Sequence, residues 1–439
     1  MKRSRVLEHR KISALKPHPR NVRTHPGKQI EALARSIEQF GFTAPALIDE
    51  FDTTLAGAAR VIAAKKAGLD EVPVVVLRGL SEAKKRAYVL ADNKISQLAG
   101  YDRPGLANEL QDLASLLAAE GLDLELTGFE PAEIDALFAD LVDPAGEFEE
   151  TLSPLPEEAV TRRGDLWVFK GQHRLLCDDA RHADYRRLMQ GEQAQMIFAD
   201  APYNVDIRKV VGRGRTKHRN FAMARGELTR AQYTEFLTET FGPAVENSAD
   251  GALSYLCVDW RHQREMLDAG DAVFGDDPKT LIVWAKSTPA QGSPYRSAHE
   301  LIYLYKHGKG PHLDNVELGK HGRNRSNVWT YAGVNTFRAG RMDELSAHPT
   351  VKPIPLVADA IRDCTRRGGI VLDPFLGSGT TIVAAEKVGR RGYGIEIDPA
   401  YVDVAIRRWM KATRSDVILE STGKTFDEVA AERANGGAA

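Results

Sequence analysis

The sequence predicts an α/β protein of two or three domains, and three observations lead to that prediction. The 439 residues are 43% hydrophobic and 27% charged, a composition typical of globular chains. They are too many for one hydrophobic core. Beyond residue 160, short apolar runs alternate with helical patterns, and this alternation indicates a mostly parallel, doubly wound sheet covered by helices.

The first hundred residues are predicted to form a smaller α+β domain. Apolar side chains at helical spacing indicate helices, two glycines indicate helix ends, and Ser81 indicates an N-cap. Short apolar runs indicate strands. The predicted helices cover 30–41, 58–69 and 81–95, and the predicted strands cover 44–50 and 72–77.

Changes in composition mark the domain borders. After the domain at 1–100, residues 101–160 continue with helical patterns and end in acids and prolines, which are typical of a linker. The larger α/β domain covers 161–413, and a tail with one short helical pattern covers 414–439. The predicted strands of the larger domain are 166–169, 195–199, 251–258, 280–285, 301–305, 369–373 and 392–397.

Charge and cysteine usage narrow the function classes. The net charge is −2, so a nucleic-acid partner must be held by local basic patches. The three cysteines are scattered, which argues against a disulfide framework and a metal site, and we expect no bound metal. No apolar stretch is long enough to span a membrane and no signal peptide is visible. We therefore expect a cytoplasmic protein without a membrane partner.

A ligand-binding unit is predicted between 368 and 401. A buried strand ends in Asp373, a glycine-rich turn follows, and a helix begins near Thr380. A second strand carries Glu396, placed to accept hydrogen bonds from ribose hydroxyls. The glycines do not fit the dinucleotide pattern, and no lysine follows them as in triphosphate-binding loops. The expected ligand is a nucleoside without a phosphate chain.

The turn, DPFLGSGTT, resembles the S-adenosylmethionine-binding signature of the amino-methylating DNA methyltransferases. The stretch HPTVKP (348–353) is similar to the element that binds the methionine end of that cofactor in the same family. The likeness covers about 160–412 and implies a Rossmann-like fold and S-adenosylmethionine as cofactor. The residues that it implies around the cofactor are Asp373, Phe375, Gly377, Gly379, Thr380 and Glu396, with His348, Thr350 and Lys352 at the methionine end, and Asp178 or Asp179 at the adenine.

The stretch IFADAPYNV (197–205) resembles the catalytic element of that family. An exocyclic amine is a poor nucleophile, so a site must accept hydrogen bonds from both of its N–H groups and expose the lone pair. Asp200 can accept one hydrogen and a backbone carbonyl of Ala201–Pro202 the other. Tyr203 offers a face on which a flipped base can stack, and Pro202 stiffens the turn.

Two details refine the resemblance. The family reads Asp-Pro-Pro-Tyr here, and Ala201 replaces the first proline; because the chemistry uses a carbonyl, we expect activity with a looser turn. The catalytic element precedes the cofactor element, as in the beta class, whose members methylate adenine N6 or cytosine N4. Asp200 as first residue favours adenine over cytosine. His299 and Glu300 precede an apolar strand and are not catalytic candidates.

Basic loops are predicted to contact DNA. One follows the catalytic turn and the other lies within 308–345, the interval that the family uses for target recognition. The predicted contacts are Arg208, Lys209, Arg213, Arg215, Lys217, Arg219, Arg323 and Arg325. A charge run can also be only a solvated loop. The expected partner is double-stranded DNA, and a homodimer is compatible with the sequence.

Residues 55–77, with their flanks, resemble the ParB-like N-terminal domain. Its typical box is Gly-x-x-Arg, and this chain keeps Gly57 and Arg60 but has two alanines between them. DNA docking or partner docking is therefore favoured over an independent nuclease, beside a purely structural role.

The sequence as a whole predicts a site-specific DNA methyltransferase, adenine N6-specific, of the kind found in restriction–modification systems. Two other hypotheses remain: the same chemistry on structured RNA, and a DNA-binding, partition-type protein with a vestigial methylase half.

Overall fold

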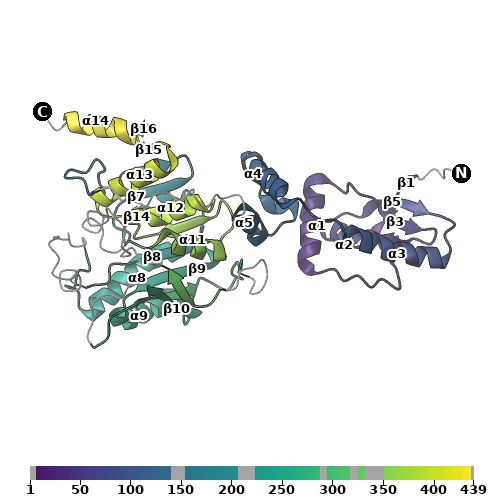
Figure 1. The fold of residues 1–439 in the computed structure, drawn as a ribbon, viewed down its shortest axis with the longest axis horizontal. Helices are drawn as coiled ribbons and strands as arrows, with labels where there is room; N and C mark the ends of the chain where they lie inside the picture. The colour runs from purple at the N-terminus through teal and green to yellow at the C-terminus, as the bar shows by residue number, and fades with distance from the viewer. Residues whose placement is uncertain are drawn as a thin grey trace. The chain divides into compact units, whose positions relative to one another are not determined.

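The computed structural model describes residues 6–139, 154–205, 223–286, 294–316, 325–331 and 351–436. Contacts divide the chain into two compact units, Met1–Pro144 and Ala145–Ala439 (Figure 1).

The first unit contains a five-stranded sheet with three helices. The strand order is β1 (Leu7–Lys11), β5 (Glu71–Leu77), β3 (Ala46–Asp49), β4 (Thr53–Ala56) and β2 (Lys16–Pro17). The helices are α1 (Gly27–Phe40), α2 (Ala58–Lys66) and α3 (Glu82–Ser96). Ile37, Ile48 and Val74 belong to the core between them. The Ser81 hydroxyl accepts a hydrogen bond from the amide of Lys84, so the predicted N-cap of α3 is confirmed.

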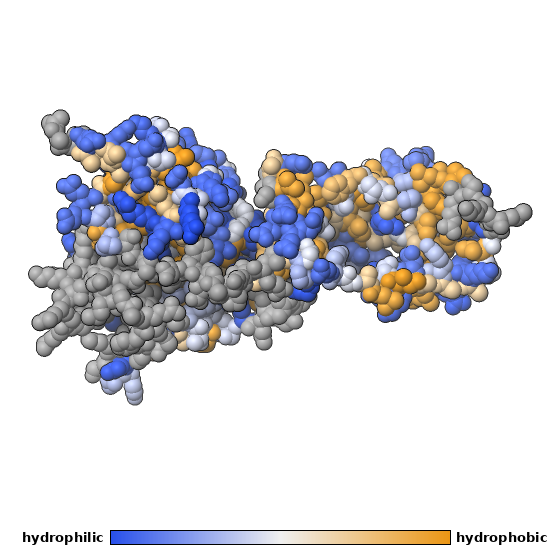
Figure 2. All heavy atoms as spheres, turned by 45° about the horizontal axis from the view of Figure 1, so that its top comes forward, coloured by the Kyte–Doolittle hydropathy of each residue, from blue (hydrophilic) through white to orange (hydrophobic). Residues whose placement is uncertain are grey.

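A helical segment follows in the same unit, formed by α4 (Arg103–Ala119), the 3-10 turn η2 (Leu124–Thr127) and α5 (Pro131–Ala139). Its small core includes Leu110 and Ile134. Figure 2 shows that hydrophobic residues reach the visible surface of this unit. Exposed examples in its helices are Phe40, Ile62 and Leu90.

The second unit has an eleven-stranded sheet among its described residues. In spatial order the strands are β12 (Val328–Tyr331), β10 (Thr280–Lys286), β11 (His299–Lys306), β9 (Ser248–Val258), β8 (Ala194–Asp200), β13 (Ile370–Asp373), β14 (Arg391–Glu396), β7 (His173–Cys177), β6 (Leu166–Phe169), β15 (Val417–Leu419) and β16 (Lys424–Thr425). The central run from β9 to β7 is parallel. Antiparallel pairs extend it on both sides. The predicted α/β class is confirmed.

Helices cover both faces of this sheet. On one face α11 (Ile354–Cys364), α12 (Thr380–Lys387), α13 (Pro399–Thr413) and α14 (Phe426–Gly436) share a core with Phe198 and Trp284. On the other face α6 (Tyr185–Met189), α8 (Arg230–Glu246) and α9 (Gln263–Phe274) pack around Ile197 and Leu372. Alternate residues of β8 thus face opposite cores, as the two-residue period of a strand requires.

The chain reverses its direction of travel across the sheet between β8 and β13. From β8 it crosses through α8 to β9 on one side, and from β13 it crosses through α12 to β14 on the other. Open α/β sheets bind ligands at the carboxyl ends of strands at such a switch point. Asp200 ends β8 and Asp373 ends β13, so the fold brings the two acids to the same edge.

The C-terminal tail joins the sheet, since β15 pairs with β6. Arg433 of α14 also donates hydrogen bonds to Asp165, just before β6. In the structure, residues that the sequence sets apart as a tail therefore extend the larger domain.

A buried ion pair stabilises the first unit, and its removal gives a test. Lys85 lies 2.9 Å from Asp49, with side chains only 4% and 7% exposed. Lys85→Met leaves the Asp49 carboxylate buried without this cation, so we expect a loss of about 3–5 kcal/mol. Hydrogen exchange of the β3 and β4 amides in the full chain measures the opening free energy.

Lys66→Met is the matched control for that measurement. Lys66 pairs with Glu31 at 2.8 Å, but both side chains are more than half exposed. Exposed pairs contribute below about 1 kcal/mol. Equal losses in the two variants would contradict the assigned role of the buried pair.

Candidate active site at the carboxyl edge of the sheet

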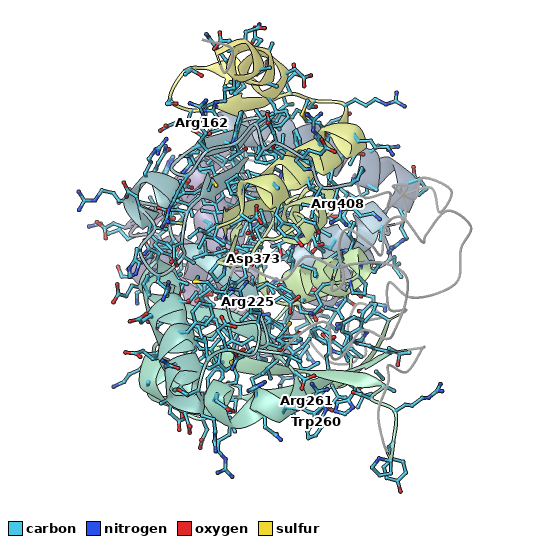
Figure 3. The ribbon with its side chains drawn as sticks, turned by 90° about the vertical axis from the view of Figure 1, so that its left-hand side faces the viewer. Arg162, Arg225, Trp260, Arg261, Asp373 and Arg408 are labelled. Carbon is cyan, nitrogen blue, oxygen red and sulfur yellow. The ribbon has the colours of Figure 1, made fainter. Side chains whose placement is uncertain are left out.

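A cavity of about 230 Å³ lies at this edge of the sheet. It contains predicted residues from both chemical elements of the sequence. Those that line it are Asp178, Asp179, Asp200, Ala201, Pro202, Tyr203, Lys352, Asp373, Phe375, Gly377, Thr380 and Glu396. Figure 3 labels Asp373, which stands near the middle of the unit in that view. The fold therefore joins the catalytic turn and the glycine-rich loop in one space.

Asp200 is held from one side by a buried ammonium. Lys352 Nζ lies 2.6 Å from Asp200 Oδ1, and the lysine side chain is 5% exposed. Burial raises the pKa of Asp200, and the charge of Lys352 opposes that rise. The carboxylates raise the pKa of Lys352 despite its burial, so the lysine stays charged. The sequence resemblance implies a place for Lys352 at the methionine end of a cofactor; in the structure its ammonium binds Asp200, the predicted catalytic acid.

Tyr203 takes part in the same group of charges. Its hydroxyl donates to Asp200 Oδ1 at 2.8 Å and accepts from Lys352 at 3.0 Å. The Lys352 ammonium also lies 5.4 Å from the centre of the tyrosine ring. The hydroxyl therefore fixes the ring beside Asp200, and base stacking on that ring stays a prediction.

The two carbonyls of the turn differ in their partners. The Pro202 carbonyl accepts a hydrogen bond of 2.8 Å from the hydroxyl of Tyr233, on α8. Ala201 is 2% exposed and its methyl group belongs to the core under α8. Among the bonds of the described residues none ends on the Ala201 carbonyl, which makes it the better candidate to accept from an amine.

The glycine-rich loop is held by two acids. Asp373 accepts from the Phe375 amide at 2.9 Å and from the Thr381 hydroxyl. Glu396 accepts from the Gly377 amide at 2.9 Å and from the Asp398 amide at 2.8 Å. Burial raises the pKa of Asp373 and of Glu396 to about 7 in each case.

Gly379 has a different role from Gly377. It does not line the cavity, but its φ is +85° and a Cβ there would lie 2.8 Å from the Ala405 Cβ. A Cβ at Gly377 would lie 3.9 Å from the Phe375 carbonyl oxygen, an ordinary contact, although φ is +54°. Gly379 thus permits the close approach of the loop to α13, and Gly377 leaves room toward the cavity.

Asp178 and Asp179 follow β7 at the far side of the cavity. The Asp178 carboxylate accepts from Arg163 at 2.8 Å, while Asp179 pairs with Arg181 at 2.7 Å. Burial favours a higher pKa for Asp179, but the Arg181 hydrogen bonds outweigh it and lower the pKa. Both acids are therefore available as hydrogen-bond acceptors.

Sequence reasoning missed Glu300, which binds both Lys352 and Tyr203. Its Oε2 lies 3.0 Å from Lys352 Nζ and 3.1 Å from the Tyr203 hydroxyl. It also missed Trp260 and Arg261, which follow β9; Arg261 lines the cavity and Trp260 is 48% exposed. The signal that the sequence offers is position alone: Glu300 directly precedes the predicted strand 301–305, and Trp260 and Arg261 closely follow the predicted strand 251–258.

Several predicted residues lie outside the described residues. These are His348, Thr350, Arg208, Lys209, Arg213, Arg215, Lys217, Arg219 and Arg323. Arg325 is described, and its guanidinium pairs with Asp359 at 3.1 Å and Asp363 at 2.8 Å. Its side chain is 18% exposed, so in this structure it serves local packing, and its DNA contact stays a prediction.

Two features are absent from the described part of the chain: a cluster of metal-ligating side chains and a helix of membrane-spanning length and apolarity. There, no group of three or more His, Cys, Asp or Glu side chains is arranged to hold a metal ion. None of the described helices is long and apolar enough to cross a membrane.

Comparisons with known proteins match three parts of the chain. Residues 194–407 match the DNA methylase family, residues 105–163 the ParB-methyltransferase HTH domain, and residues 2–94 the ParB N-terminal domain.

Individual relatives agree with these matches. The type II methyltransferase M2.DpnII of Streptococcus pneumoniae is 35% identical over 135 residues, which are 29% of this chain and 49% of that protein. The ParB-like nuclease domain-containing protein YnaK of Escherichia coli is 44% identical over 80 residues, 18% of this chain and 92% of that one. The chain spans between 29% and 50% of the methyltransferase relatives that it matches.

Among solved structures, a putative DNA modification methylase from Thermus thermophilus, complexed with S-adenosyl-L-methionine, is 21% identical, with a TM-score of 0.39. The match covers 58% of this chain and 96% of that one. The three family matches by themselves confirm the sequence resemblance: the chain carries a DNA methylase domain of the amino-methylating (N6/N4) family, which uses S-adenosylmethionine, together with a ParB N-terminal domain and a ParB-methyltransferase HTH domain.

Proposed function

We propose that the chain transfers a methyl group from S-adenosylmethionine to the exocyclic amine of a flipped DNA base, adenine N6 in the first place. One observation carries this proposal: Asp200 of the catalytic turn and Asp373 and Glu396 of the glycine-rich unit line one cavity. Family membership supports the reaction class. That the methylated base is adenine, and that the whole protein acts on DNA, are both part of this proposal.

The residues of the cavity fit this cofactor. Glu396 and Asp178 offer acceptor oxygens for hydroxyl and amine groups, while Phe375, Ile397 and Tyr401 offer apolar wall. Glu396 would hold the ribose and Asp178 or Asp179 the adenine amine. When bound, S-adenosylmethionine supplies an electrophilic methyl group on a sulfonium that is its own leaving group.

The chain's own contribution is orientation of the amine. In this proposal one N–H donates to Asp200 and the other to the Ala201 carbonyl, so the nitrogen lone pair points away from both acceptors. Asp200 also stabilises the positive charge that grows on the amine nitrogen. After methyl transfer the positively charged nitrogen releases one proton, which restores a neutral amine. Asp200 is placed to accept that proton. Cytosine N4 is the alternative, since either amine fits the same two acceptors.

Described residues beside the cavity offer a DNA contact. Arg261 lines the cavity, and its guanidinium lies 5.7 Å from the ring centre of Trp260 (Figure 3). An exposed indole can stack on a base, and an arginine can bind phosphate. The basic loops predicted from the sequence would extend this contact. The N-terminal domain is proposed to dock DNA or a partner.

The identity of the acceptor gives the first test. Wild-type protein, tritiated S-adenosylmethionine and duplex DNA should give labelled N6-methyladenine after nucleoside digestion. Asp200→Ala should lower kcat by at least about a hundredfold, because the amine loses an oriented acceptor. Asp276→Ala, which removes an acid that pairs with Lys279 on the surface, is the control.

Three outcomes of that test contradict parts of the proposal. Labelled N4-methylcytosine would contradict the choice of adenine, and labelled RNA in a parallel reaction would contradict DNA as the acceptor. Wild-type protein that transfers no methyl group would favour the vestigial-methylase alternative.

The pKa of Glu396 gives a second test, through cofactor affinity. An ionised carboxylate accepts hydrogen bonds from ribose hydroxyls more strongly than a protonated one, so affinity should fall as the pH drops below the pKa of about 7. We expect the Kd for S-adenosylmethionine, measured by calorimetry, to rise about tenfold from about pH 8 to about pH 6. Glu396→Gln should bind more weakly at the higher pH and show a flatter profile. An unchanged slope in this variant would contradict the ribose contact.

Trp260 gives a third test, through DNA affinity. Trp260→Ala removes a stacking surface worth about 1–3 kcal/mol per base, so the Kd for duplex DNA should rise about tenfold or more at fixed salt. Cofactor affinity should stay the same. Ile418→Ala, which trims another exposed apolar side chain on β15, is the control. Equal DNA affinities of wild type and Trp260→Ala would contradict the contact.

A further inference from the structure

We propose that Glu300 is a positioning residue of the methyl-transfer site: with Lys286 it holds Lys352 and the Tyr203 hydroxyl on Asp200 Oδ1, which leaves Oδ2 for the amine. The inference rests on the proposed methyl transfer and adds residues that neither the motifs nor the family match assigns. It explains why a glutamate is enclosed beside the catalytic turn.

The contacts form a closed group of two acids, two lysines and one tyrosine. Lys352 bridges Asp200 at 2.6 Å and Glu300 at 3.0 Å. The Tyr203 hydroxyl reaches both acids, at 2.8 Å and 3.1 Å. Lys286 binds the second oxygen of Glu300, Oε1. Lys286, Glu300, Lys352 and Asp200 are therefore joined in that order by direct contacts.

The register of the sheet places these groups on one face. Asp200 pairs with Cys257, and Cys257 pairs with Ile302, so the three side chains point the same way. Glu300 lies two residues before Ile302 and thus on that same face. Trp284 pairs with Glu300, and Lys286 follows two residues later. The antiparallel strands β10 and β11 thus carry a cation and an acid to the carboxyl edge of the parallel strands.

The charges balance only when all four groups are present. Asp200 and Glu300 supply two negative charges, and Lys286 and Lys352 two positive ones. Burial favours a raised pKa for Glu300, but the two ammonium groups outweigh it and lower the pKa to about 2. The Trp284 ring also lies 4.8 Å from the Lys286 ammonium and 5.8 Å from that of Lys352. Removal of Glu300 leaves two cations near a single carboxylate.

The geometry has a consequence for the amine. Among the described residues, the ion pair with Lys352 and the hydrogen bond from Tyr203 are both at Oδ1 of Asp200. The carboxylate is therefore anchored by one oxygen and can accept with the other. Without Glu300, Lys352 and Tyr203 lose their second partner and can turn toward Oδ2, where they compete with the amine.

Glu300→Gln is the direct test, since it keeps the shape of the side chain and removes its charge. We expect kcat to fall about tenfold or more, with KM for DNA and Kd for the cofactor changed less than about twofold. Lys352 loses one of the carboxylates that raise its pKa, so the alkaline limb of the kcat profile should move to lower pH. A purely structural role predicts no such movement.

Two further variants complete the experiment. Glu265→Gln removes another buried glutamate, which pairs with Arg230 at 3.2 Å and does not line the cavity. It should leave kcat and its pH profile as in the wild type. Lys286→Met changes a side chain that is 23% exposed and removes one cation from Glu300. Glu300 then loses the cation that binds its Oε1, so kcat should fall in this variant too, with the Kd for the cofactor as in the wild type.

The outcomes separate this inference from the proposed function. Wild-type protein without methyl transfer contradicts the proposed function itself. A folded Glu300→Gln with the wild-type kcat and alkaline limb contradicts the positioning role. If Glu300→Gln does not fold, a wild-type kcat in Lys286→Met contradicts it instead. A raised cofactor Kd at unchanged kcat would assign Glu300 to binding and also overturn the inference.

Discussion

The parallel pairing of β8 with β13 is the constraint on which the site depends. These strands are neighbours at the point where the chain reverses its direction across the sheet. Because they are parallel, their carboxyl ends lie at one edge. The chemical groups then follow from strand length alone: Asp200 ends the first strand and Asp373 the second. A shift of either strand by one residue would turn its acid to the opposite face of the sheet, away from the cavity.

The antiparallel strands β10 and β11 add charged side chains to the site that the parallel strands form. They deliver Lys286 and Glu300, and the stretch before α11 delivers Lys352. Buried charges of one sign are costly, so each of these groups depends on the others for its ionised state. Asp200, the proposed catalytic acid, is therefore linked to the antiparallel strands β10 and β11.

Local motifs made much of this site predictable. The glycine turn, the acid of the second strand and the catalytic tetrapeptide keep their chemistry within a few consecutive residues, and the structure brings them into one cavity. The role of Glu300 is not visible in the sequence, because its partners come from the turn after β8, from β10 and from the stretch before α11, which no single window of sequence contains. The burial of the Ala201 methyl group was not visible in the sequence either, because it depends on packing against residues far away in the chain. Two acids hold Arg325, and its predicted DNA contact stays a prediction.

The most direct measurement is a structure of the chain with S-adenosylhomocysteine and a DNA duplex that carries one unpaired, extrahelical adenine. We predict the adenine amine between Asp200 Oδ2 and the Ala201 carbonyl, with Lys352 and Tyr203 still on Oδ1. We also predict the ribose of the cofactor on Glu396. An amine that binds elsewhere in the cavity, or that displaces Lys352 from Asp200, would contradict the proposed arrangement.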